Sequence, residues 1–216
     1  MKKINTVLIA LSTPLIIAMM VVNLFISHQF LKIEYQMPWF PPDTFGFSIE
    51  DRLAWGGMTI DYLRFGEEYQ SLSDIKMLDG TAIYNEREIS HLVDVKNVID
   101  MMNQTMLKTL VLFIAILFLA YKQKDFSAVY KGVYYASMFT LIAILSIGGF
   151  ASISFWKFFE WFHSIFFQGD TWLFLVSDSL IRLFPIVFWQ DAVMYILAII
   201  ILINLVLFFV MKRKSS

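Results

Sequence analysis

The chain contains no cysteine and only three histidines. The lack of cysteine excludes disulfide bonds, thiolate nucleophiles and cysteine-bound metals. It leaves the redox compartment open, because a protein without cysteine is compatible with any of them. Few groups then remain that can transfer protons near neutral pH, and histidine is the foremost of these.

A strong charge of one sign is also missing, since the formal net charge is −1. This balance gives no indication of nucleic-acid binding. What the chain does have is apolar surface: 58% of its residues are hydrophobic and 22 are phenylalanine. Such a composition is too apolar for an ordinary soluble domain and predicts a membrane protein.

Four apolar stretches are each near the length of about 20 residues that a hydrocarbon core requires. Because that core holds no water, each stretch is predicted to be a helix. We interpret the first as a retained helix rather than a signal peptide, since no small-x-small cleavage site follows it. The predicted spans are residues 1–27, 106–121, 133–159 and 192–211, separated by segments 28–105, 122–132 and 160–191 and followed by a tail, 212–216.

Basic residues flank alternate ends of these spans. They precede the first span, separate the second from the third, and follow the fourth: Lys2, Lys3, Lys122, Lys124, Lys131, Lys212, Arg213 and Lys214. The positive-inside rule then places both termini and the loop 122–132 in the cytoplasm. Segments 28–105 and 160–191 are expected outside. All six tryptophans fall on that side, five in these segments and Trp156 at the outer end of the third span. We therefore expect the outer segments to pack as a cap.

The cap is expected to mix strands and helices. Phe30–Gln36 is interpreted as a short strand, and Ile75–Tyr84 as a hairpin around the Asp79-Gly80 turn signal. The predicted fold class is therefore an α-helical membrane protein with four transmembrane helices and a small mixed α/β extracytoplasmic cap.

Two helix starts are also predicted in the cap. Ser48 with Asp51 has the spacing of a capping box, and its helix is expected to end near Gly66. Asn85 with Glu88 favours a second start, and apolar residues at three-four spacing predict an amphipathic helix over 86–102 that leads toward the second span. Asp191 is expected to cap the last span.

Two of the histidines lie in or beside aromatic-rich segments on the predicted outer side. His91 is on the amphipathic helix with Glu88 and Asp94 at steps of three, so either carboxylate is able to orient its imidazole. His163 lies among the aromatics of 155–167. Each alone is also consistent with a structural or interfacial histidine, as we interpret His28. As a pair of ionisable groups at a membrane surface, they are functional candidates.

Other chemistries lack their motifs. There is no H-E-x-x-H pattern, so a metal would need ligands gathered from separate segments. There is no G-x-S-x-G elbow, no phosphate loop and no dinucleotide fingerprint. We therefore expect no metal and no cofactor.

Three segments of the chain resemble signatures of a known family. Residues 87–96 resemble the first signature, 162–172 the second, and 178–185, with Phe188 and Asp191 beyond it, the third. In length, number of spans and order of these motifs, nearly the whole chain resembles the four-span bacterial membrane family that includes lipoprotein intramolecular transacylase.

The resemblance implies an acyltransferase of the bacterial plasma membrane whose partners are a diacylglyceryl-modified lipoprotein N-terminus and membrane lipids. It would move the sn-2 acyl chain of the diacylglyceryl-cysteine to the α-amino group, giving a lyso-form lipoprotein. The resemblance carries His91 and His163 over as catalytic residues. The supporting residues that it implies are Glu88, Asp94, Asp170, Trp172, Asp178 and Arg182.

Our hypothesis from the sequence is that His91 acts as general base, oriented by Glu88 or Asp94, while His163 protonates the leaving oxygen or stabilises the oxyanion. The two roles are exchangeable, and an acyl-histidine intermediate is an alternative route. Two other functions stay open at this point: a non-enzymatic membrane sensor or accessory protein that binds a partner through its outer cap, and a metal-dependent membrane hydrolase. The sequence predicts no oligomeric state.

Overall fold

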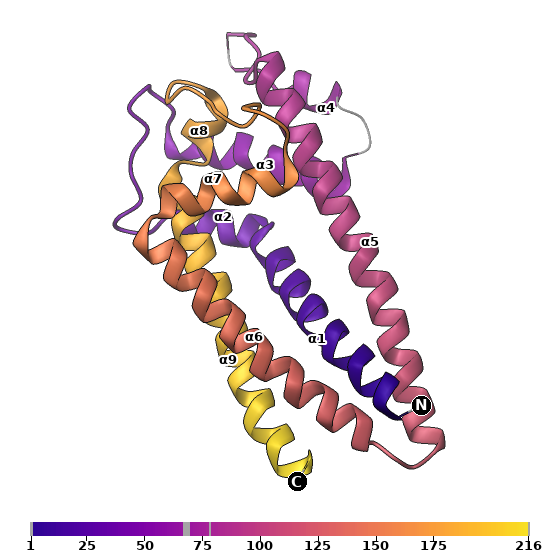
Figure 1. The fold of residues 1–216 in the computed structure, drawn as a ribbon. Coiled ribbons are helices and arrows are strands. Elements are labelled where there is room, and N and C mark those ends of the chain that lie inside the picture. The colour runs from indigo at the N-terminus through magenta and orange to yellow at the C-terminus, as the bar shows by residue number, and fades with distance from the viewer. Residues whose placement is uncertain (1, 67–69, 78, 216) are drawn as a thin grey trace. The chain divides into compact units, whose positions relative to one another are not determined.

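A computed structural model describes residues 2–66, 70–77 and 79–215 (Figure 1). Every regular element in these ranges is a helix. The helices are α1 (Lys2–Phe25), α2 (His28–Tyr35), α3 (Ile49–Phe65), α4 (Gln70–Ser73), α5 (Glu86–Lys122), α6 (Ser127–Ile153), α7 (Phe155–Phe166), α8 (Ser179–Leu183) and α9 (Ile186–Ser215). Helices α1, α5, α6 and α9 are each long and apolar enough to cross a membrane. The protein is thus an all-helical, multi-pass membrane protein.

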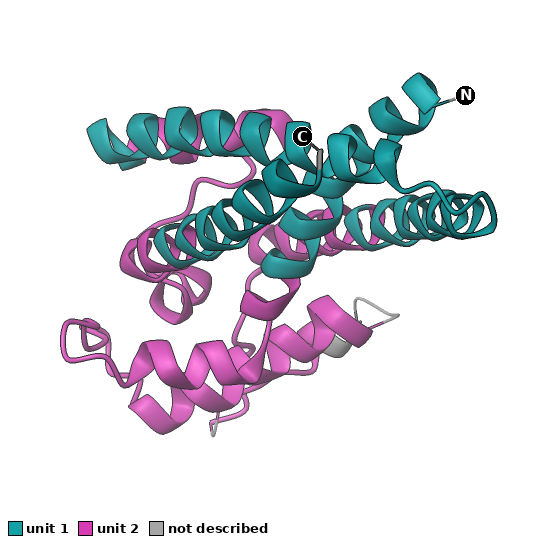
Figure 2. Cartoon of the chain, turned by 90° about the horizontal axis from the view of Figure 1, so that it is seen from below, with its two compact units in different colours: residues 1–22, 102–155, 194–216 teal, residues 23–101, 156–193 magenta. Residues whose placement is uncertain are grey.

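The chain divides into two compact units (Figure 2). Unit 1 contains residues 1–22, 102–155 and 194–216, and so most of the apolar helical length. Its core includes Ile9 of α1, Ile116 of α5 and Val133 of α6. At Gly132 an added Cβ would lie 2.5 Å from Ile9 Cγ2. A glycine therefore permits the close approach of α6 to α1 at this point.

Unit 2 contains residues 23–101 and 156–193, which include all three histidines. Within it α3 packs on α2 and on α8. Helix α3 begins with the predicted capping box, since Ser48 Oγ accepts from Asp51 N and Asp51 Oδ2 accepts from Ser48 N. It ends at Phe65 with Gly66 as the C-cap residue, as predicted.

The predicted strand Phe30–Gln36 is wrong, because these residues are in α2 apart from Gln36, its C-cap. Ser27 caps this helix by accepting from Phe30 N at 3.2 Å. Leu31 lies against Gly56 of α3, where an added Cβ would be 3.2 Å from its Cδ2 atom. Burial against a neighbouring helix thus outweighs the alternating pattern that favours a strand.

The predicted hairpin at 75–84 is reduced, in its described residues, to a turn with one isolated bridge and no strands. Lys76 and Ala82 form an isolated antiparallel bridge, and Gly80 has a φ of +85°. Residue 78, inside the predicted hairpin, lies outside the described residues. Across the described ranges no strand forms, so the mixed α/β cap is wrong and unit 2 is helical with loops.

Two predicted helix boundaries differ from those in the structure. The predicted third span, 133–159, is interrupted at Ser154, whose extended backbone (φ −155°, ψ 97°) separates α6 from α7. The last helix begins at Ile186, so Asp191 lies inside it and does not cap it. Instead, Asp191 Oδ2 accepts a hydrogen bond from Trp39 Nε1 at 2.7 Å. The predicted amphipathic helix 86–102 and span 106–121 are parts of one helix, α5.

Candidate functional site

His91 and His163 come from different helices and lie next to each other in unit 2. His91 is in the second turn of α5, and His163 is in the last turn of α7. Their ring centroids are 6.2 Å apart and their planes differ by 23°. Both are buried, with exposed fractions of 7% and 8%. The fold therefore brings the two sequence-predicted histidines into one site.

The His91 end of α5 does not belong to the apolar part of that helix. The helix has 37 residues, so it is about 55 Å long at 1.5 Å per residue. A hydrocarbon core of about 30 Å needs only part of this length. Most charged residues of α5 precede Met102: Glu86, Arg87, Glu88, Asp94, Lys96 and Asp100. His91 thus lies in the polar extension of the helix, outside the spanning segment.

Aromatic rings surround the histidine pair. His163 contacts Phe159 and Trp172 at centroid distances of 4.0 and 4.6 Å. Phe167 contacts both imidazoles, at 4.9 Å from His91 and 5.5 Å from His163. This environment disfavours charge, so burial, together with the neighbouring His163, lowers the pKa of His91 to about 4.

Burial also lowers the pKa of His163, although its hydrogen bond to Phe159 acts in the opposite direction. Both imidazoles are therefore neutral near pH 7. The bond to Phe159 also fixes a tautomer, because His163 Nδ1 is 2.7 Å from the Phe159 carbonyl oxygen. A carbonyl only accepts, so Nδ1 carries the hydrogen and Nε2 keeps its lone pair. His91 Nδ1, by contrast, is buried and has no hydrogen-bond partner among the described residues.

Glu88 and Asp94 were the two carboxylates predicted to orient His91. Glu88 is 1% exposed and accepts backbone hydrogen bonds from Asn85 N at 2.8 Å and from Leu180 N at 2.6 Å. The first, with the return bond from Glu88 N to Asn85 Oδ1, forms the predicted helix start. Asp94 is half-buried one turn beyond His91. Neither carboxylate bonds His91 Nδ1, and the orienting role stays a prediction.

The second signature contributes a loop that is held by Arg87. The Arg87 Nη2 atom donates to the carbonyl oxygen of Asp170 at 2.7 Å, so Asp170 acts here through its backbone. The Arg87 guanidinium also lies 5.6 Å from the centroid of Phe174. Trp172 contacts His163, and Phe174 contacts His91 at 5.3 Å. Arg87 therefore tethers the loop that places these two rings against the histidines.

The third signature stabilises the chain around α8. Asp178 Oδ2 accepts from Leu175 N at 2.8 Å and closes the loop before the helix. Arg182 forms a bidentate ion pair with Asp43, through Nε at 3.1 Å and Nη2 at 3.0 Å. Its guanidinium also lies 3.1 Å from the centroid of Phe47. The pair joins α8 to the loop between α2 and α3.

Sequence reasoning assigned no role to Arg87, Asp43, Phe167 or Phe174. Arg87 stood inside the first signature segment, and that position was the available signal. The Arg182–Asp43 pair joins residues far apart in the chain, and no local pattern marks Asp43 as the partner. Over the described part of the chain, no three or more His, Cys, Asp or Glu side chains gather in a way that could hold a metal ion.

Comparison with known proteins gives solved structures of the same fold. An in meso structure of the membrane-integral lipoprotein intramolecular transacylase Lit from Bacillus cereus matches with a TM-score of 0.78 and 20% identity, covering 100% of this chain and 99% of that one. Two variants of that protein, with one histidine replaced by arginine or alanine, match with TM-scores of 0.64 and 0.68 at 19% and 20% identity. They cover 100% of this chain and 95% and 96% of the variant chains.

Relatives are also found by sequence. An uncharacterized protein from Aquifex aeolicus (strain VF5) is 23% identical over 210 residues, which is 97% of this chain and 94% of that protein. The model of the family described as lipoprotein intramolecular transacylase Lit matches residues 7–189. This match includes both histidines and all three signature segments. The chain therefore belongs to the lipoprotein intramolecular transacylase Lit family of membrane enzymes.

Proposed function

We propose that the enzyme moves the sn-2 acyl chain of a diacylglyceryl-modified lipoprotein from the glycerol oxygen to the α-amino group of the N-terminal cysteine. The product is an N-acyl, S-monoacylglyceryl lipoprotein. Family membership supports lipoprotein transacylation. The observation that carries the finer proposal is the pair of buried, neutral imidazoles 6.2 Å apart inside an aromatic enclosure.

The substrate sets what catalysis must supply. Exchange of an ester for an amide is downhill and needs no nucleotide, which agrees with the lack of a phosphate loop. Attack of the amine on the sn-2 carbonyl within the same molecule closes a ring of about eight atoms, which forms poorly unless the ends are held together. Positioning, removal of one proton and stabilisation of the oxyanion are therefore the main requirements.

His163 is the proposed general base. Its Nδ1 hydrogen is committed to the Phe159 carbonyl, so the lone pair of Nε2 is available for a proton. An α-amine has a pKa of about 8, within reach of an imidazole base. As the nitrogen–carbon bond forms, Nε2 takes the amine proton. It returns that proton to the glycerol oxygen as the carbon–oxygen bond breaks, so the balance closes without any co-reactant.

His91 is the proposed hydrogen-bond donor to the oxyanion. A pKa lowered to about 4 makes it a weak base but keeps it neutral and able to donate an N–H. Its Nδ1 atom has no partner in the described part of the chain. These observations favour exchanging the roles of the sequence-based hypothesis, which placed the base at His91.

The aromatic enclosure has a second proposed role. Water that reached the ester would hydrolyse it and release a free fatty acid. Phe159, Phe167, Trp172 and Phe174 lie against the two imidazoles and leave each histidine less than one-tenth exposed. Exclusion of water then favours the tethered amine over hydrolysis.

The proposed location is the outer leaflet of a bacterial plasma membrane, with both chain termini in the cytoplasm. Unit 2 is made from the segments that connect the first span to the second and the third to the fourth. The lysines and arginines at the opposite ends of the spans support this orientation. The lipoprotein N-terminus and the surrounding lipids are then the proposed partners.

A direct test uses purified protein and a synthetic diacylglyceryl lipopeptide, with the acyl position determined by tandem mass spectrometry. We expect conversion to the lyso form without added phospholipid and in the presence of a chelator. His91→Leu and His163→Leu should each lower the rate at least about 100-fold. A matched control is His28→Asn, because His28 is exposed, pairs with Asp61 and should retain the wild-type rate. Lyso-form product at the wild-type level in both leucine variants would exclude the proposal.

Glutamine variants separate the two roles. His91→Gln retains an N–H donor and should be at least about tenfold more active than His91→Leu. His163→Gln cannot accept a proton and should be as inactive as His163→Leu. The reverse ranking would return the base to His91.

A further inference from the structure

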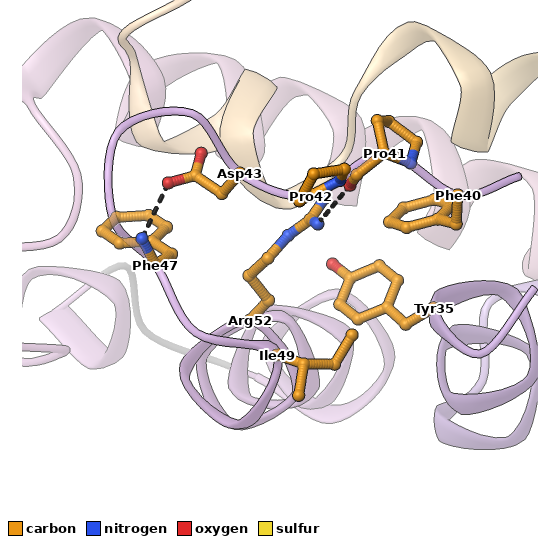
Figure 3. Close-up of a pocket in the computed structure, with 8 residues that line it drawn as sticks. All are labelled: Tyr35, Phe40, Pro41, Pro42, Asp43, Phe47, Ile49 and Arg52. Atoms are coloured by element: carbon orange, nitrogen blue, oxygen red, sulfur yellow. Dashed lines mark hydrogen bonds between the residues drawn. The ribbon is translucent and has the colours of Figure 1, made fainter. Parts of the chain in front are cut away.

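A second polar site lies in unit 2, between the loop after α2 and the first turn of α3 (Figure 3). It is a pocket of about 240 Å³. In Figure 3 the side chain of Arg52 extends from α3 toward Pro41, with Tyr35 and Phe40 on one side and Asp43 and Phe47 on the other. Neither catalytic histidine lines this pocket.

Arg52 is buried, and its neighbours compensate its charge only in part. It is 2% exposed, and its guanidinium carbon lies 4.7 Å from the Tyr35 centroid and 4.8 Å from the Phe40 centroid. Nη1 donates to the Pro41 carbonyl at 2.9 Å, and the Tyr35 hydroxyl is a further hydrogen-bond partner, whereas the buried Nε has no partner among the described residues. An arginine stays charged in a protein. The charge of Asp43 favours this cation, but Asp43 is shared with Arg182. A buried cation whose counter-charge is shared is costly, so a further anion would stabilise it.

The carboxylate in the same pocket is already engaged. Asp43 accepts both hydrogen bonds of Arg182 and two backbone hydrogen bonds, from Phe45 N at 3.1 Å and from Phe47 N at 2.7 Å. Its side chain is 3% exposed. Two guanidinium groups therefore share one carboxylate, and the hydrogen bonds of that carboxylate go to Arg182 and the backbone. Two arginines and one aspartate leave an excess of positive charge in the pocket, and it lies on Arg52.

We propose that this pocket binds a phosphate group. A guanidinium matches phosphate oxygens in geometry and charge. The aromatic rings around Arg52 and the exposed side chain of Ile49 at the pocket suit an ester with an apolar part better than a free, fully hydrated ion. Tyr35 donates its hydroxyl to the carbonyl of Leu183, and the spanning helix α9 begins at Ile186. A membrane phospholipid headgroup is therefore a source within reach, with free phosphate as the other.

The test measures binding to the full-length protein in a neutral maltoside detergent. The probes are dioctanoyl phosphatidylglycerol, inorganic phosphate and, as the control that has acyl chains but no phosphate, dioctanoylglycerol. The measurements are the dissociation constant and the shift in Tm. Arg52→Gln removes the charge. Ile49→Trp fills the pocket from its exposed rim and leaves Arg52 in place. Arg64→Gln is the control, since Arg64 is an exposed arginine on the same helix that donates to the Ile26 carbonyl.

We expect phosphatidylglycerol to bind wild-type protein and the Arg64 control equally and to raise both Tm values. Arg52→Gln and Ile49→Trp should each weaken binding at least tenfold, because charge-assisted hydrogen bonds are lost or the pocket is filled. Inorganic phosphate binding as tightly as the lipid would support the site with free phosphate as its source. If Arg52→Gln fails to fold, Ile49→Trp decides. No phosphate probe binding to wild-type protein, or unchanged affinity in the variants that fold, would overturn the proposal.

Discussion

Substitution of Glu88 by glutamine separates a structural role from a catalytic one at the centre of the site. In the structure both carboxylate oxygens point at backbone N–H groups, Oε2 at Asn85 and Oε1 at Leu180. Glutamine has one oxygen, so one bond is retained and an amide NH₂ group opposes the other N–H. Loss of a charge-assisted hydrogen bond costs about 1.5–3 kcal/mol, and a buried unsatisfied donor about 1–3 kcal/mol more.

The expected destabilisation for Glu88→Gln is therefore roughly 2.5–6 kcal/mol. For a chain of this size that corresponds to a fall in Tm of the order of 10 °C. Thermal unfolding in detergent measures this fall, and lipopeptide turnover at a temperature well below the variant's Tm measures activity. Because Glu88 does not bond His91 Nδ1, we expect turnover within about threefold of wild type in the protein that stays folded.

The opposite pattern would refute this reasoning. A Tm within 2 °C of wild type, combined with a loss of turnover of about 100-fold or more, is the size expected for loss of a general acid–base function. Glu88 would then act on the imidazole, as the sequence-based hypothesis proposed. Glu86→Gln is the matched control, because Glu86 is exposed in the same first turn of α5 and should change neither quantity.

Three further predictions follow from contacts in unit 2. Arg182→Lys replaces a bidentate contact with Asp43 by a single one and should lower the free energy of unfolding by about 1–3 kcal/mol, measured by thermal unfolding against wild type; an unchanged Tm would contradict it. Arg87→Leu removes the exposed hydrogen bond at 2.7 Å to the Asp170 carbonyl, which holds the loop before α8. The value of kcat/KM should then fall roughly tenfold, while the free energy of unfolding falls by less than about 1 kcal/mol. Unchanged kinetics would exclude a role for this hydrogen bond in positioning the loop. The folded pKa of His91, about 4, lies below its ordinary 6.5, so the unfolded state binds the proton first and stability falls as pH drops from about 6.5 toward 4. Burial and the neighbouring Asp191 raise the pKa of Glu34 to about 8, and this group acts in the opposite direction between pH 4.5 and 8. The pH slope of Tm is therefore compared between wild type and His91→Asn, in which Glu34 is unchanged. Equal slopes would contradict the prediction.

The parts of the fold that could be predicted from sequence have strong local signals. Long apolar stretches require helices wherever water is absent, and the structure has four helices of that kind in its described residues. The capping pairs at Ser48 and Asn85 are set by side chains three residues apart. The strand predicted at Phe30–Gln36 failed because its alternating apolar residues are equally consistent with Leu31 and Tyr35 one helical turn apart, facing Gly56.

The two histidines of the candidate site could be predicted from the sequence, but the hydrogen bonds and the ion pair around them could not. The two histidines drew attention because few other groups in the chain move protons. Their neighbours are a different matter, because Arg87 reaches a backbone carbonyl at Asp170 and Arg182 reaches Asp43 across more than half the chain. Any residue type can supply a backbone acceptor, so residue identity does not predict one. An ion pair between residues far apart in the chain is not predicted by local spacing either. Such pairings are fixed only when the helices have packed.

The hydrogen bond between His163 and the carbonyl of Phe159 has a consequence for acid tolerance and for evolution. In a serine-protease triad, an aspartate holds the imidazole in its working tautomer. For the base that we propose at His163, a peptide group four residues earlier on the same helix has that position. A peptide oxygen does not titrate in the range in which an imidazole does. A fall in pH therefore protonates His163 before it affects the carbonyl that fixes its tautomer. Every residue type has a backbone carbonyl. Substitution of Phe159 therefore retains the acceptor for His163 Nδ1 as long as α7 remains helical at this point.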